Sequence, residues 1–229
     1  MKPARRRAAV ALALGLAGLL GATMATALLD FVSFDGVDYI RFADEPGRAL
    51  TRADLGVEFA TVECSISEDA RGCPYGTDAA AAFMPTGTRM YVVRGYRTEF
   101  RIAAVWQDRI FLYQAWRNPK AKAGADLFDI AGKVREIDVQ RGEPMSDVAR
   151  RPAVISATAD AEAIVGMILR GAVRKPSPHT VGEPRYWLTL WLADGTTLGR
   201  SYFPESGELM GGVVLPAEFA KILERYLGK

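Results

Sequence analysis

The sequence has one histidine and two cysteines in 229 residues, and this scarcity excludes several kinds of chemistry. No Cys-x-x-Cys pair occurs, so one imidazole and scattered carboxylates are the remaining ligands for a zinc ion. The chain also lacks Gly-x-Ser-x-Gly, and no serine is followed three residues later by lysine. It has neither a phosphate-binding glycine loop nor an acidic calcium loop. We therefore expect no catalytic motif, no metal and no cofactor.

The single histidine, His179, lies between Arg174 and Arg185 in a segment with three prolines and a glycine. This composition predicts a loop, and a solvent-exposed histidine rather than a general base. The adjacent acidic pairs Asp44-Glu45 and Glu68-Asp69 are interpreted as solvated charge, because neighbouring side chains usually point apart. Carboxylates distant in the chain can still meet, so a hydrolase with a carboxylate pair stays open as an alternative.

Charge is absent from Ala8 to Leu29, which follow a basic start with Lys2 and three arginines. A basic start before an apolar run is typical of a bacterial export signal. The 22 residues would span roughly 33 Å as a helix, enough to cross a bilayer core. Cations before the run place the N-terminus in the cytoplasm and the remainder of the chain outside it.

The same run also carries features of a cleaved signal peptide. Gly21 weakens the helix after a leucine-rich centre, and Ala25-Thr26-Ala27 has the small-x-small pattern of a cleavage site. The sequence thus predicts an extracytoplasmic protein with two open alternatives. Either residues 1–29 anchor it in the membrane, or it is secreted after cleavage near Ala27.

The mature chain is close to neutral. Four of the 29 basic residues precede Ala27 and no acidic ones do, so removing that segment changes the net charge from +2 to −2. A nucleic-acid partner would normally require a clustered basic face, and the sequence has none. We therefore expect no nucleic-acid binding.

Cys64 and Cys73 are separated by eight residues. In an oxidising compartment an isolated pair usually forms a disulfide, which here would close a short polar loop. A redox or metal role is the alternative.

The fold class predicted by the hydrophobic pattern is α+β. Residues 30–117 read as a β-rich domain, with Asp35-Gly36 and Gln107-Asp108 as turns between strands. Expected strands in this half are 31–34, 37–42, 57–66, 89–93, 100–106 and 109–113.

Residues 118–132 break this pattern and are predicted to be a linker, followed by an α+β domain over 133–229. Apolar residues at helical spacing predict two amphipathic helices, one over 160–170 with Thr158 as its cap and one after Pro216. The expected strands in this half are 134–140, 186–192, 196–203 and 209–214.

One short run has a familiar form: Pro85-Thr-Gly-Thr-Arg-Met-Tyr91, then Arg94-Gly-Tyr96 and Phe100-Arg-Ile-Ala-Ala104. It resembles a P-x-G-T-x-x-Y … G-Y … F-R-x-A run found in exported or membrane-anchored bacterial proteins of unknown function. The resemblance covers about 20 residues. It implies a location at the cell envelope and no activity.

An aromatic pattern marks the predicted antiparallel hairpin of 186–203. If Asp194-Gly195 is a two-residue turn, Trp187 and Trp191 share one face of the hairpin with Arg200 and Tyr202. That face would form a flat platform for a sugar ring, a polymer or a protein. The alternative is that a helix or the first half of the chain covers it.

These observations favour a non-catalytic binding module at the cell envelope, with an envelope polymer or an envelope protein as partner. Besides the hydrolase, an accessory subunit of a membrane complex is an alternative. If the leader is uncleaved, the membrane is a further partner through Ala8–Leu29.

Overall fold

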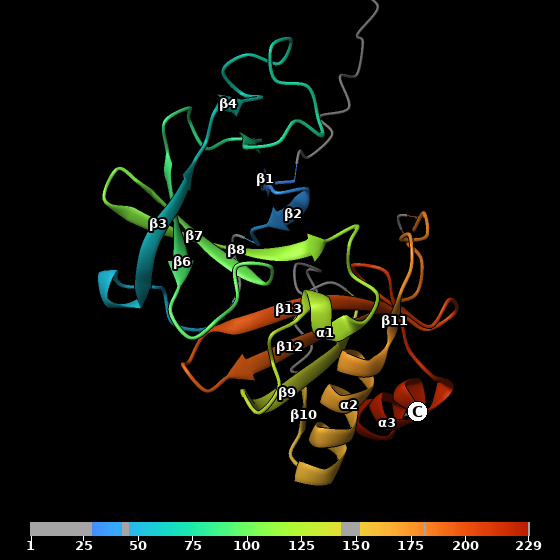
Figure 1. Cartoon of the computed structure of the whole chain (residues 1–229). Coiled ribbons are helices and arrows are strands. Elements are labelled where there is room, and N and C mark those ends of the chain that lie inside the picture. The colour runs from blue at the N-terminus through green and yellow to red at the C-terminus, as the bar shows by residue number, and fades with distance from the viewer. Residues whose placement is uncertain (1–28, 43–45, 143–151, 181, 229) are drawn as a thin grey trace, which may run out of the picture.

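The computed structural model describes residues 29–42, 46–142, 152–180 and 182–228, and it confirms the α+β class. Two β-sheets lie against each other, and the helices lie with the second sheet (Figure 1). The predicted leader falls largely outside the described residues, as do Asp44 and Glu45. Within the described ranges, no helix combines the length and the apolar character needed to cross a bilayer.

Among the described residues, eight strands from the first half of the chain form the first sheet, and its spatial order brings β8 beside the N-terminal hairpin. In that order the strands are β3 (Leu55–Thr61), β6 (Arg89–Val93), β7 (Arg101–Trp106), β8 (Arg109–Arg117), β2 (Val37–Ile40), β1 (Phe31–Phe34), β5 (Ala80–Ala81) and β4 (Cys64–Ser65). A 3₁₀ turn at Arg52–Asp54 precedes β3.

Two turns of this sheet follow directly from the sequence. Asp35 and Gly36 have φ of 52° and 74°, and Gln107 and Asp108 have φ of 47° and 59°. Two successive residues with positive φ match the twist of adjoining strands. Both predicted turns therefore join paired strands, β1 to β2 and β7 to β8. The strand expected over 57–66 is instead divided into β3 and β4.

The second sheet has seven strands in the part of the chain that the structure describes, in the order β10 (Ala153–Ile155), β9 (Val134–Arg141), β12 (Tyr186–Leu192), β13 (Thr197–Phe203), β14 (Glu208–Leu209), β15 (Val213–Val214) and β11 (Ala172–Val173). The helices described are α1 (Gly124–Leu127), α2 (Thr158–Arg170) and α3 (Ala217–Leu227). Helix α2 begins at Thr158 with Ala157 as its N-cap, so the predicted cap is one residue late. The single strand expected over 209–214 is a pair, β14 and β15.

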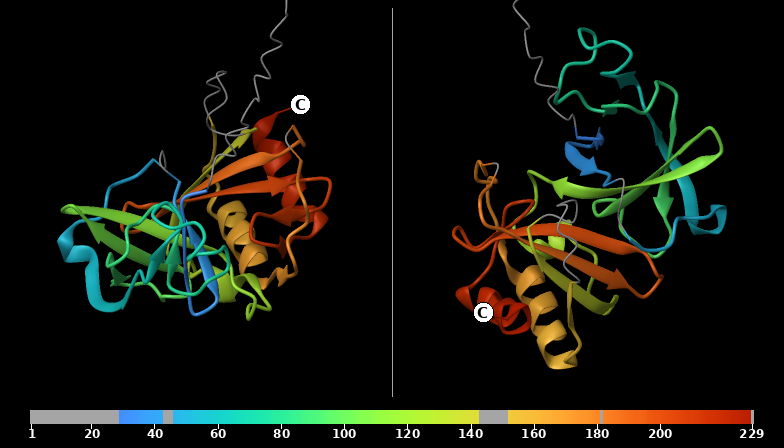
Figure 2. Two further views of the ribbon diagram at one scale, coloured as in Figure 1. Left: turned by 90° about the horizontal axis from the view of Figure 1, so that it is seen from above. Right: turned by 180° about the vertical axis from the view of Figure 1, so that it is seen from behind.

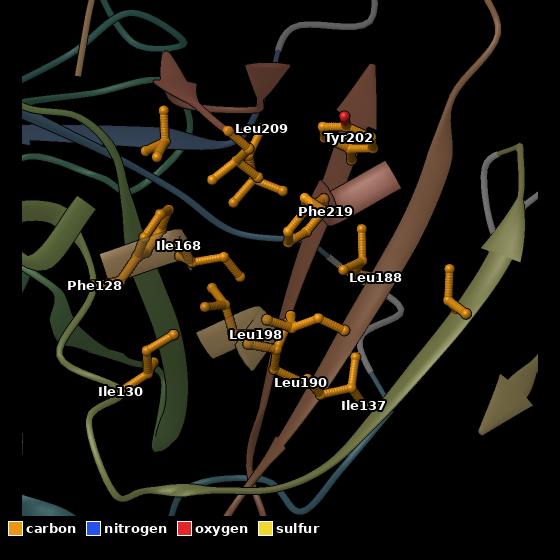
Figure 3. Packing of buried hydrophobic residues seen from close by; sticks show 14 of the residues in the cluster. Phe128, Ile130, Ile137, Ile168, Leu188, Leu190, Leu198, Tyr202, Leu209 and Phe219 are labelled. Atoms are coloured by element: carbon orange, nitrogen blue, oxygen red, sulfur yellow. The ribbon is translucent and has the colours of Figure 1, made fainter. Parts of the chain in front are cut away.

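Helices α2 and α3 pack on β9 and β10 and enclose the larger of the hydrophobic cores. Figure 3 shows Leu188, Leu190 and Ile137 of the sheet beneath Ile168 of α2 and Phe219 of α3. This layering follows from helices with one apolar stripe packing on one sheet face.

The second part of the segment 118–132, which the sequence suggested as a linker, packs into this core. Leu127, Phe128 and Ile130 are at most 1% exposed and pack among the residues of the second sheet. Phe100 from the first half joins the same cluster. The larger hydrophobic core therefore includes residues from both sides of the domain boundary that the sequence suggested.

Figure 2 shows the two sheets side by side. Buried arginines connect them. Arg101 of β7 is fully buried, and its guanidinium donates to Thr196 Oγ1 at 2.6 Å and to the Thr197 carbonyl. Gln114 of β8 donates to that same carbonyl at 2.9 Å. From the second sheet, Arg200 donates to the Ala115 carbonyl at 2.7 Å. Such bonds satisfy charges removed from water and fix how the sheets lie relative to each other.

Cys64 and Cys73 form the expected disulfide, with Cα atoms 5.6 Å apart. A structural disulfide favours an oxidising compartment, which agrees with an extracytoplasmic location. The bridge holds the loop that leads from β4 to β5.

Candidate binding site

The candidate site is a cleft of about 300 Å³ on the face of the second sheet that points away from α2 and α3. Strands β9 and β12 form its floor. The described residues that line it are Pro46, Asp138, Gln140, Pro152, Trp187, Thr189 and Trp191. In the register of the two strands, Trp187 lies opposite Gln140 and Thr189 opposite Asp138. Alternation along each strand brings these side chains to one face.

Hydrogen bonds orient both indole rings of the cleft. Trp191 Nε1 donates to Asp138 Oδ2 at 2.8 Å, which joins β12 to β9 across the face. Trp187 Nε1 donates to Thr189 Oγ1 at 3.1 Å within β12. Because the polar edge of each ring already has a partner, the apolar ring surface remains for packing.

The two tryptophans differ in accessibility. Trp187 is 6% exposed, and Phe42 from the first half packs against it edge to face with centroids 5.3 Å apart. Trp191 is half-buried and keeps part of its surface open to the cleft. Of the two alternatives for this face, cover by the first half of the chain therefore holds at Trp187, while Trp191 stays partly open.

Arg200 and Tyr202 do not belong to this face. Three residues, Ala193–Gly195, form the loop, because the Gly195 amide bonds the Leu192 carbonyl and the Leu192 amide bonds the Thr196 carbonyl. Gly195 has φ of +82°, as expected where a three-residue loop ends in a left-handed residue. The pairing therefore shifts by one residue from the predicted register.

A one-residue shift moves every side chain of a strand to the opposite face. Tyr202 pairs with Tyr186 and lies in the core against Phe219, 1% exposed. Arg200 pairs with Leu188 and is fully buried, with its guanidinium 5.5 Å from the centre of the Phe128 ring. Neither residue faces the cleft.

Asp194 and Tyr96, which have shifted pKa values, hold the β12–β13 loop beside the cleft. Burial raises the pKa of Asp194, but hydrogen bonds from Thr196 and Tyr96 and the charge of Arg101 outweigh it, so the pKa lies below its usual value. Burial likewise raises the pKa of Tyr96 to about 12. Asp194 therefore stays ionised and keeps the β12–β13 loop on the first sheet.

His179 is mostly buried, contrary to the expectation of a solvent-exposed residue. Its ring stacks on Phe203 with centroids 3.4 Å apart. Nδ1 lies 3.1 Å from Glu183 Oε2, and Nε2 lies 3.4 Å from Glu208 Oε1. Ser177 Oγ donates to Glu208 at 2.8 Å. Both ring nitrogens thus face carboxylates, and the histidine holds its loop against β13 and β14.

The polar groups of the cleft are a carboxylate, an amide and a hydroxyl. Asp138 is the single carboxylate among the described lining residues, and its two oxygens have the capacity to accept further bonds besides the one from Trp191. The Gln140 amide makes no side-chain hydrogen bond to the described residues. Within the described chain, no cluster of three or more His, Cys, Asp or Glu residues is arranged to hold a metal ion.

Sequence reasoning found the two tryptophans and missed Asp138 and Gln140. The alternation of 134–140 predicted their strand, but nothing local indicates that β9 pairs with a strand about 50 residues further along. Comparisons with protein-family models, curated proteins and solved structures give no match for the chain.

Proposed function

We propose that this protein is a non-catalytic binding protein of the bacterial cell envelope that binds a sugar ring of an envelope polymer in the Trp187–Trp191 cleft. The cleft supports this proposal because it combines an open indole surface, a carboxylate and an amide within about 300 Å³. Sites for small ligands typically have aromatic linings with a few polar groups, in volumes upward of ~300 Å³.

A sugar matches this cleft better than a flat protein surface. The C–H face of a pyranose can pack on the half-buried Trp191, while its hydroxyls donate to Asp138 and bond the Gln140 amide. Pro46 and Pro152 add apolar surface to the lining. A large protein partner would need a broader exposed surface.

The location outside the cytoplasm is supported by the disulfide and by the basic and apolar start of the sequence. Membrane anchoring through Ala8–Leu29 and secretion after cleavage near Ala27 both remain proposals. So does the relationship to exported bacterial proteins suggested by the Pro85–Ala104 run. The hydrolase alternative gains no support from a cleft with one described carboxylate.

The test is calorimetric titration of the purified protein with peptidoglycan fragments and with soluble envelope polysaccharide. Trp191→Ala should weaken binding at least about tenfold, because it removes the stacking surface. Trp106→Ala is the matched control, since Trp106 is 36% exposed on β7 and outside the cleft. Unchanged affinity in Trp191→Ala, with native circular dichroism, would contradict the proposal.

A further inference from the structure

The start of the folded region lies directly after the apolar run. The run ends at Leu29, and β1 begins at Phe31, so a single residue, Asp30, separates them. One extended residue spans at most about 3.6 Å. If the run crosses the membrane, the start of β1 must therefore lie within a few ångström of the lipid headgroups.

Exposed apolar side chains gather around this starting point. Leu29 is 51% exposed, Tyr75 is 62% exposed and Phe83 is 45% exposed. The Tyr75 ring packs edge to face on Phe31, with centroids 5.2 Å apart. Phe83 directly follows Ala82, whose amide bonds the Phe31 carbonyl. Three large apolar groups thus flank the point where the chain enters the fold.

The fold holds this cluster in place. Tyr75 comes two residues after Cys73, so the disulfide restrains the loop that carries it. Strand β5 pairs with β1 and fixes the approach to Phe83. Strands β1, β4 and β5 lie at the end of the molecule opposite α2 and α3 (Figure 1). The apolar groups therefore belong to one end of the molecule.

We propose that this end rests on the outer surface of the membrane, with Leu29, Tyr75 and Phe83 in the headgroup layer. The inference rests on the anchored alternative of the proposed function. The headgroup layer suits Tyr75, which has an apolar ring and a polar hydroxyl. The boundary between headgroups and acyl chains accepts apolar groups such as Phe83 and Leu29. Exposed Tyr75 and Phe83 are thereby accounted for by the same short connection that brings them to the lipid.

The charges nearby indicate which lipids favour the contact. Glu68, Asp69 and Asp78 are exposed around the disulfide loop, against one exposed arginine, Arg71. An anionic surface would repel this set, and salt would screen the repulsion. The contact is therefore apolar in origin, and it should be stronger on zwitterionic phosphatidylcholine than on phosphatidylglycerol.

The test uses the full chain reconstituted into phosphatidylcholine vesicles that contain a headgroup-spin-labelled lipid. Tyr75→Cys and Phe83→Cys, each carrying one environment-sensitive fluorophore, report proximity to the headgroups. Val154→Cys is the matched control, because Val154 is 44% exposed on β10 at the edge of the second sheet. Mass measurement checks that each chain carries one label and keeps the Cys64–Cys73 bridge.

Quenching at positions 75 and 83 should exceed that at 154 by at least about twofold, and phosphatidylglycerol should reduce it in low salt. Equal quenching at all three positions, in protein that resists extraction with alkaline carbonate, would overturn the surface contact while anchoring stands. Release by carbonate would overturn anchoring and the contact together. Glycan titration of the same vesicles reports the cleft independently.

Discussion

Replacing Arg101 by methionine tests whether buried arginines join the two sheets. The change keeps most of the side-chain volume and removes the bonds to Thr196 Oγ1 and to the Thr197 carbonyl. Bonds to a charged group contribute about 1.5–3 kcal/mol each. Both acceptors keep another partner, because Thr196 Oγ1 donates to Asp194 and Gln114 bonds the Thr197 carbonyl. We therefore expect a loss of about 3 kcal/mol rather than the full sum.

The loss is measured by urea unfolding followed by tryptophan fluorescence, with the midpoint and the slope fitted together. Arg52→Met is the matched control, because Arg52 and its partner Asp108 are 72% and 95% exposed. That pair should change stability by less than about 0.5 kcal/mol. If Arg101→Met lowers the free energy of unfolding by less than about 1 kcal/mol, the reasoning is refuted, and apolar contacts rather than buried arginines hold the two sheets together.

Three further outcomes follow from the described contacts. Hydrogen bonds from Arg48 hold the pKa of Asp54 well below its usual value. The stability that these bonds provide is therefore present near neutral pH and is lost as the pH falls below about 4. In Asp54→Asn, the midpoint of urea unfolding should depend less on pH in this acidic range. The pKa of Tyr96 is raised to about 12 in the folded protein. The unfolded chain loses this proton above about pH 10, so the free energy of unfolding should decline as the pH rises further, and the decline should be smaller in Tyr96→Phe. The double change Cys64→Ser/Cys73→Ser should cost about 2–3 kcal/mol in urea unfolding, through the freed ten-residue loop.

Features that depend on residues close together in sequence were predicted correctly more often than features that depend on distant residues. The turns at Asp35-Gly36 and Gln107-Asp108 are local, and both were predicted. The loop at Asp194-Gly195 looked the same, but a third residue entered it and reversed the faces of β13. The sequence alone does not distinguish a two-residue loop from a three-residue loop, because Asp-Gly is compatible with both lengths.

Non-local pairing explains the other misses. Phe128 falls in the predicted linker because the residues of the second sheet that contact it lie far along the chain. His179 read as solvent-exposed because Glu208 and Phe203, which cover it, come from later strands. Trp187 and Trp191 were identified as a pair by alternation, whereas Asp138 joins them through a strand contact that no local pattern indicates.

The most direct test of the binding cleft is the indole N–H spectrum of the four tryptophans during addition of peptidoglycan fragments. Contact with a sugar ring should shift the Trp191 signal most and the Trp187 signal next, because both indoles line the cleft. Trp106 and Trp116 lie outside it and should keep their positions. Saturating fragments that leave the Trp191 signal unmoved, or that shift Trp106 instead, would contradict a sugar-binding cleft at this face.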